Sequence, residues 1–199
     1  MYNANSFLLS ILFMSNHSDT SRRFFVLSAL GSDRPGIVAE VTELLQEHGC
    51  NVEESRMSIL GGEFGLLMLV SASEGSEKSV SEHISELEAS GGLEIRWKST
   101  EAPQEHRTPD AIPYQVKAYA IDLEGIIHAI SEALSNMKVN IVTASTTSYP
   151  APISGTPLFQ MEMAIDVPKD LDLAEVRQQM HLVARNQNAD IEISFVEGH

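Results

Sequence analysis

Cysteine is almost absent from this 199-residue sequence, and the one present, Cys50, has no partner for an intrachain disulfide. A single thiol also excludes zinc sites built from several cysteines. The histidines are scattered, and none follows the His-Glu-x-x-His spacing of a helical metal site. A chain without disulfides is typical of a reducing compartment. We therefore expect a cytoplasmic protein with no metal and no other cofactor.

Positive charge is scarce as well. The 28 acidic side chains outnumber the 13 lysines and arginines, and the formal net charge is −15. The acidic excess extends over both halves of the sequence. Because a phosphate backbone is repelled by such a field, we expect no direct binding to nucleic acid. The remaining composition, with 43% hydrophobic and 21% charged residues, is typical of a globular protein.

The amino terminus lacks a hydrophobic run long enough for a membrane span. Ser6–Met14 is apolar, but it is shorter than the roughly 20 residues that cross a bilayer. It has no basic segment before it and no clear cleavage site, which disfavours a secretory signal. Residues 1–22 are therefore expected to be a flexible extension or a removable organelle leader, unless translation starts at Met14. We expect no association with a membrane.

The sequence does contain an internal repeat. Phe25–Asn51 aligns with Tyr114–Asn140 without a gap, and Phe64–Val70 matches Phe159–Ile165 in its apolar positions. Because the similarity covers only two copies, it indicates a duplicated domain rather than a long repeat array. The predicted organisation is a first domain over residues 23–99, a proline-rich linker over residues 100–113 and a second domain over residues 114–199.

Each copy shows the same succession of hydrophobic periods. An apolar run, a helical stripe, a hairpin, a second helical stripe and a final alternating strand follow one another, and Gly91-Gly92 provides a stop for the second helix. In the first copy these segments are Phe24–Leu30, Ile37–Leu45, Val52–Leu60 with Phe64–Val70, Val80–Leu87 and Leu93–Trp97. In the second they are Tyr114–Ile121, Gly125–Met137, Asn140–Ser148 with Leu158–Asp166, Leu173–Val183 and Asp190–Val196. The order predicts two α+β, ferredoxin-like βαββαβ domains, each an antiparallel sheet with helices on one face.

The hairpin of the second copy carries an insertion, Tyr149–Pro157, that is rich in proline. We expect a long loop there, which is either a binding surface or a tolerated insertion.

The turn after the first strand carries the strongest candidate for a binding site. Its residues are Asp33, Arg34, Pro35, Gly36 and Ile37. Proline suits the first position of a helix, and glycine allows a ligand to approach the first turn. The free N–H groups of a helix start favour a carboxylate. The aspartate would either cap these groups or bind an ammonium group.

Asn51 is the second candidate, because it opens the second strand and its amide offers both a donor and an acceptor. The alternative is a polar turn residue after Gly49. In the second copy the matching positions are Asp122, Gly125 and Asn140, but Leu123-Glu124 stands where the first copy has Arg-Pro. The second copy is therefore the weaker candidate.

The segment DRPGIVAEVTELLQEHGCNV, residues 33–52, strongly resembles the start of an ACT domain, the βαββαβ module that senses amino acids. The resemblance implies an effector site between paired modules, lined by Asp33, Gly36 and Asn51 and, in the second copy, by Asp122, Gly125 and Asn140. It also implies a small amino acid as effector, with glycine or serine as examples.

Three function classes remain to be compared. A duplicated sensing module without a catalytic set favours a regulatory protein that acts through another protein, such as a transcription factor. A regulatory subunit of an amino-acid or one-carbon metabolic enzyme is the alternative. An enzyme is disfavoured. A known type of enzyme carries a similar amino-terminal module, but it needs a separate hydrolase domain, and the two copies leave no residues here to build one. Unpaired edge strands lead us to expect a homo-oligomer.

Overall fold

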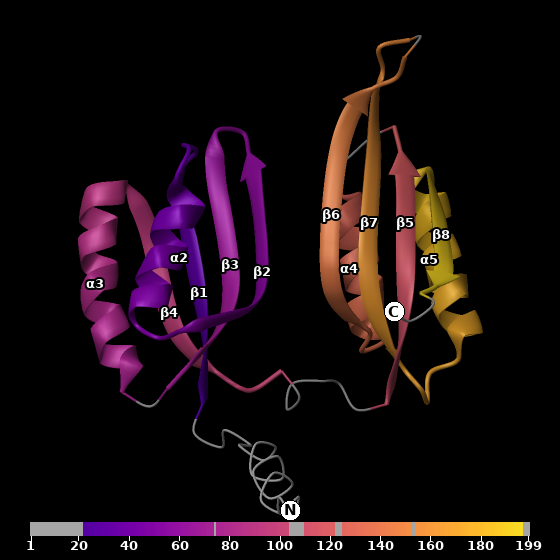
Figure 1. Cartoon of the computed structure of the whole chain (residues 1–199). Helices are drawn as coiled ribbons and strands as arrows, with labels where there is room; N and C mark the ends of the chain where they lie inside the picture. The colour runs from indigo at the N-terminus through magenta and orange to yellow at the C-terminus, as the bar shows by residue number, and fades with distance from the viewer. Residues whose placement is uncertain (1–21, 74, 104–109, 122–124, 153, 197–199) are drawn as a thin grey trace, which may run out of the picture. The chain divides into compact units, whose positions relative to one another are not determined.

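The computed structural model describes residues 22–73, 75–103, 110–121, 125–152 and 154–196. The chain divides into two compact units between Arg107 and Thr108. Each unit has its own four-stranded sheet and its own apolar core. The expected order βαββαβ is confirmed in both copies, as Figure 1 shows.

The first unit contains an antiparallel sheet with strand order β2-β3-β1-β4, on which two helices pack. Its elements are β1 (Arg23–Ser32), α2 (Ile37–Glu47), β2 (Asn51–Leu60), β3 (Glu63–Ala72), α3 (Ser76–Gly91) and β4 (Leu93–Thr100). The alternation of β1 buries Phe25, Leu27 and Ala29 against the helices. The helical stripe of α2 buries Val41 and Leu45 on the other side of the same core.

The second unit repeats this arrangement with strand order β6-β7-β5-β8. Its elements are β5 (Ala111–Ala120), α4 (Ile126–Asn136), β6 (Asn140–Pro150), β7 (Pro157–Pro168), α5 (Leu173–Gln187) and β8 (Ala189–Phe195). Residues at matching positions fill the two cores: Leu45 and Leu134 are 1% and 0% exposed. The duplication seen in the sequence is therefore a duplication of the core.

The segment expected to be a linker is shorter than residues 100–113, because β5 begins at Ala111. Pro113 lies within this strand, opposite Asp166 of β7. The Pro113 carbonyl accepts a hydrogen bond from the Val196 N–H at 3.5 Å. The paired register of β5 with β8 starts only at the next residue, Tyr114, so the N–H that proline lacks lies at the end of this ladder. A proline near a strand end loses little, which explains why it does not interrupt the sheet.

The proline-rich insertion also forms less loop than expected. Tyr149 pairs with Leu158 and Pro150 pairs with Pro157, so the hairpin β6–β7 extends into the insertion. A bond from the Ala151 N–H to the Thr156 carbonyl, 2.8 Å long, closes the tip. The expectation of a loop over the whole of Tyr149–Pro157 is wrong, because two strands can continue through paired prolines at the end of a ladder.

The expected extension, residues 1–22, lies outside the described residues except for Arg22. Within the part of the chain that the structure describes, none of the helices is both long and apolar enough to cross a membrane.

Candidate functional site

The turn between β1 and α2 leaves the start of the helix open. Gly36 is the N-cap residue and has a φ of 101°, a left-handed conformation that favours glycine. Among the described residues, no side chain caps this helix. Asp33 is exposed, and its main-chain N–H donates to the Gly62 carbonyl at 2.9 Å. The N–H groups of the first turn are therefore available to an anion from outside, and Asp33 is not the cap.

Pro35 lies before the N-cap, so it is not the first helical residue as its position in the sequence suggests. Ile37 begins the helix and is 1% exposed, which makes it part of the core. The structure therefore separates the five candidates of this turn. Gly36 adopts the left-handed conformation that the N-cap of α2 requires, Ile37 anchors the helix in the core, and the side chain of Asp33 is accessible.

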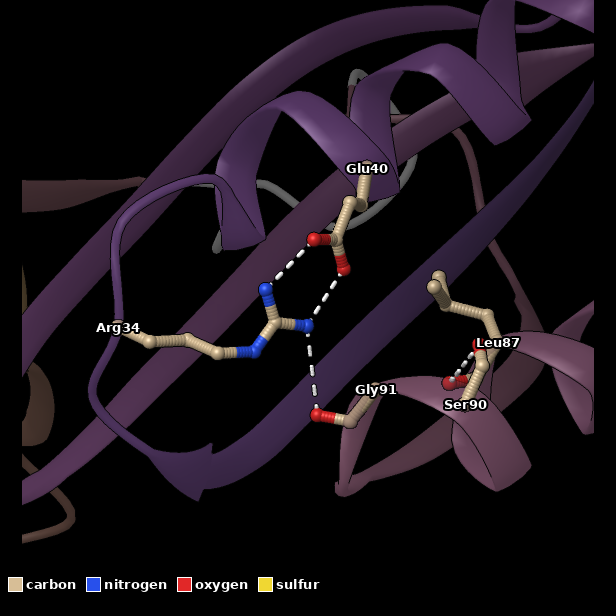
Figure 2. A network of polar contacts seen from close by, with 5 residues as sticks. All are labelled: Arg34, Glu40, Leu87, Ser90 and Gly91. Carbon is tan, nitrogen blue, oxygen red and sulfur yellow. Dashed lines mark hydrogen bonds and ion pairs between the residues drawn. The ribbon is translucent and has the colours of Figure 1, made fainter.

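Arg34 is held by two other elements, as Figure 2 shows. Its guanidinium donates to both carboxylate oxygens of Glu40 at 2.5 and 2.6 Å. One of the same nitrogens, Nη2, reaches the Gly91 carbonyl at the end of α3, at 3.3 Å. Such a bidentate pair fixes geometry as well as charge. Arg34 thus positions the turn by fastening it to the first turn of α2 and the last residue of α3.

The hydrogen bonds from Arg34 lower the pKa of the Glu40 carboxyl, and the positive charge adds to the effect. In Arg34→Ala the pKa of Glu40 should rise toward its ordinary value, because the hydrogen bonds and the positive charge of Arg34 are both lost. A carbon-detected NMR titration of the glutamate carboxyls measures this value. Arg96→Ala on β4 is the control and should leave Glu40 unchanged. An unaltered Glu40 in Arg34→Ala would contradict the pairing in Figure 2.

Asn51 belongs to a different polar group at the start of β2. Its side-chain amide donates to Glu53 at 2.9 Å, and the hydroxyl of Ser71 donates to the same carboxylate oxygen at 2.5 Å. Arg22 donates to the Ser71 hydroxyl at 3.0 Å. Hydrogen bonds from Ser71 and Asn51 lower the pKa of Glu53. One N–H of the Asn51 amide is thus engaged, and its carbonyl oxygen is the atom that can accept a bond from a ligand.

Sequence reasoning missed Glu53 and Ser71. Asn51 and Glu53 are two residues apart in the sequence, but the register of β2 shifts between Val52 and Glu54, so simple strand alternation does not place Glu53. Ser71 opposes Asn51 on β3, and no sequence pattern gives that register.

The two candidate groups lie at opposite ends of the first sheet. Both β1 and β2 run antiparallel to β3, so they are parallel to each other. Asp33 follows the end of β1 beside Gly62, whereas Asn51 opposes Ser71 at the other end of β3. The nine residues from Gly62 to Ser71, at about 3.3 Å each, separate them by roughly 30 Å. A single copy therefore does not bring Asp33 and Asn51 to one small ligand.

The second copy has the same backbone at the corresponding turn. Gly125 is the N-cap of α4 with a φ of 84°, and no side chain caps this helix within the described residues. Asp122 lies outside the described residues. Asn140 is exposed at the start of β6, opposite Asp166, so it too lies at the far end of its sheet.

Comparison with known proteins assigns this architecture to a family. The ACT domain model matches residues 23–98. The first copy is therefore an ACT domain, and the second copy repeats its βαββαβ order, as in a tandem ACT-domain protein. The glycine cleavage system transcriptional repressor of Escherichia coli K12 is 28% identical over 177 residues, which are 89% of this chain and 92% of the relative.

Two solved structures extend the similarity over both copies. An unknown protein from Galdieria sulphuraria is 32% identical, with a TM-score of 0.77 over 88% of this chain and 99% of its own. A structure ascribed to a glycine cleavage system transcriptional repressor is 25% identical, with a TM-score of 0.64 over 89% of this chain and 99% of its own. The chain is an ACT-domain regulatory protein similar to that repressor.

Proposed function

We propose that this chain senses a small amino acid and passes the signal to a protein partner, as a regulator rather than an enzyme. The observation that carries the proposal is the open start of α2. Its N-cap is a glycine, no described side chain caps it, and the exposed carboxylate of Asp33 lies three residues before that cap. Free N–H groups suit the carboxylate of an amino acid, and Asp33 suits its ammonium group.

The distance between Asp33 and Asn51 restricts how the site is built. If both residues contact one ligand, they must come from different modules, because each lies at its own end of the sheet. The turn of one module would then meet the second strand of another. The partner module is either the second copy, with Asn140, or a second chain, with Asn51.

The test of amino-acid binding is calorimetric titration of the full chain, after a thermal-shift screen of the twenty amino acids. Asp33→Ala should weaken binding of the best amino acid tenfold to a hundredfold, because a charge-assisted hydrogen bond is lost. Asn51→Ala should weaken it about fivefold, since its bond is neutral. The matching changes Asp122→Ala and Asn140→Ala are the controls for the second copy.

Each outcome of this titration distinguishes an arrangement. If Asn140→Ala weakens binding and Asn51→Ala does not, the site joins the first turn to the second copy. If Asn51→Ala weakens binding and Asn140→Ala does not, two chains pair. If no amino acid binds at millimolar concentration, or if Asp33→Ala binds as tightly as the parent, sensing through this turn is refuted.

The class of partner is inferred from the similar repressor. A transcription factor is the first candidate, and a metabolic enzyme of amino-acid or one-carbon metabolism is the second. Capture from native extract with and without the best amino acid distinguishes them by the identity of the retained protein. Direct DNA binding remains disfavoured by the net charge of −15, and a mobility shift with the purified chain alone would contradict this expectation.

The expected homo-oligomer has a physical basis in the edge strand β2, which is exposed along its whole length. It carries Met57, Ile59 and Leu60, which are 48%, 58% and 75% exposed. An apolar edge strand is a template for pairing.

A further inference from the structure

The first sheet has an outer face, directed away from α2 and α3, with an apolar centre. Strand side chains alternate between the two faces, so the neighbours of the buried Phe25, Leu27 and Ala29 point outward. Four outward side chains on the two central strands, β1 and β3, form an apolar stripe, namely Val26, Leu30, Leu67 and Leu69. Leu30 and Leu67 are 53% and 49% exposed, and the other two are partly buried. Within the first unit, no described element covers the apolar stripe.

The apolar stripe is a property of the first copy and not of the fold. The repeat places Gln115 at the position of Val26 and Glu162 at the position of Leu67. Both sheets have the same topology, and the second one forms with these polar side chains on its outward face. The fold therefore does not require apolar side chains there. Exposed apolar side chains that gather on one face mark an interaction surface.

Charged side chains border the apolar stripe on the two edge strands. The strand register places four side chains in one row across β2, β3, β1 and β4, in the order Glu54, Leu69, Val26 and Lys98. The row thus runs from an acid over two apolar residues to a base. Glu54 accepts a hydrogen bond from Arg56 at 2.5 Å, whereas Lys98 forms no ion pair or side-chain hydrogen bond within the residues that the structure describes. A carboxylate accepts several bonds, so Glu54 is still available to a second cation.

This row is complementary to itself. Two such sheets that stack face to face about a two-fold axis parallel to their strands meet with reversed strand order, so β4 of each copy lies over β2 of the other. Lys98 then faces Glu54 of the second copy, and Val26 faces Leu69 of the second copy. A two-fold axis across the strands would instead place Lys98 over its own counterpart, which charge repulsion disfavours.

The next row along the strands contains two arginines, and its charges are also compensated. Arg56 on β2 would face Arg96 on β4 of the second copy. Glu54 and Glu94 lie in the rows on either side, about 7 Å away along the strands. Each arginine therefore has a carboxylate of its own copy and one of the second copy nearby.

We propose that the outer face of the first sheet binds the same face of a second copy of this chain, as a symmetric dimer. The self-complementary row argues for a second copy rather than for an unrelated partner. Four strands about 4.8 Å apart, over about eight residues of about 3.3 Å, cover roughly 500 Å² on each copy. A total of about 1,000 Å² is at the lower limit for specific interfaces, so the dimer should dissociate measurably on dilution. The proposal rests on the expected homo-oligomer and is independent of amino-acid sensing.

The experiment measures sedimentation of the full chain at concentrations from about 1 to 200 μM, where the parent should pass from monomer to dimer. Leu67→Glu introduces the residue that the second copy has at this position, so the fold should tolerate it. It should weaken dimerisation at least about tenfold, because a carboxylate would be buried against the apolar stripe. Ile59→Glu is the matched control. Ile59 is 58% exposed on β2, but it pairs with the buried Phe64 and so lies on the helix side of the sheet. This control should change the dissociation constant less than about threefold.

Charge reversal tests the strand register of the dimer. Lys98→Glu and Glu54→Lys should each weaken self-association about tenfold, because like charges then face each other twice across the two-fold axis. In an equimolar mixture of the two variants, both contacts join opposite charges again. The mixture should therefore form a heterodimer within about threefold of the parent affinity.

A parent chain that remains monomeric over the whole range overturns both the proposal and the expected homo-oligomer. The proposal alone is overturned if Ile59→Glu disrupts the dimer and Leu67→Glu does not, because the copies then pair through the edge of β2. It is also overturned if the mixture of the two charge variants associates no more tightly than each variant by itself. Rescue of Lys98→Glu by Glu192→Lys, on the outward face of the second sheet, would overturn it too, because the face then binds the second sheet of another copy.

Discussion

Gly31→Ala should destabilise the first domain by about 2–3 kcal/mol, as expected for a side chain forced into filled space. A Cβ at this position would lie 2.6 Å from the Gly92 carbonyl oxygen and 2.9 Å from Leu93 Cδ2. The carbonyl is main chain at the end of α3, so it cannot move aside without shifting the helix end. Gly31 in β1 therefore permits the close approach of α3 and β4 to the strand that leads into the candidate site.

Gly65 in β3 provides the matched control. It is a strand glycine of the same sheet, but the nearest atom to its Cβ would be the Ser58 carbonyl oxygen at 3.9 Å. Gly65→Ala should change the free energy of unfolding by less than about 0.5 kcal/mol. Urea unfolding followed by the fluorescence of Trp97, the single tryptophan, measures both variants. Equal stabilities of the two variants would contradict the packing described around Gly31.

The fold was accessible from the sequence because local patterns and the repeat agreed. Gly91-Gly92 indicated a helix stop, and α3 does end at Gly91 with Gly92 in a left-handed conformation. The start of β5 and the end of β6 were predicted wrongly, because a proline, judged without its strand partners, usually marks the end of a strand. Their positions at the ends of paired ladders make them tolerable, and that depends on partners far along the chain.

The candidate site was accessible only in part. The open turn at Gly36 follows from the local motif, because a left-handed glycine before a helix is a local property. The separation of Asp33 from Asn51 depends on which strands neighbour each other, and strand order is not encoded locally. Arg34 likewise finds its third contact at Gly91, at a sequence distance of 57 residues.

The two cores predict two separate unfolding events. Leu45 belongs to the first core and Leu134 to the second, at matching positions of the repeat, and both are fully buried. Truncating either to alanine should cost about 2–5 kcal/mol, from lost burial and from the cavity left behind. Because Trp97 packs against the first core, its fluorescence reports that domain.

Leu45→Ala should therefore lower the urea midpoint seen by Trp97 fluorescence, whereas Leu134→Ala should leave that midpoint in place. Circular dichroism reports the helices of both domains. In Leu134→Ala its signal should therefore show an additional transition at lower urea concentration, which the Trp97 fluorescence does not show. A loss of about 3 kcal/mol with an urea m-value of about 1–2 kcal/mol/M moves a midpoint by roughly 1.5–3 M, which is easily resolved. If Leu134→Ala shifts the Trp97 midpoint as far as Leu45→Ala does, the two domains unfold as one cooperative unit.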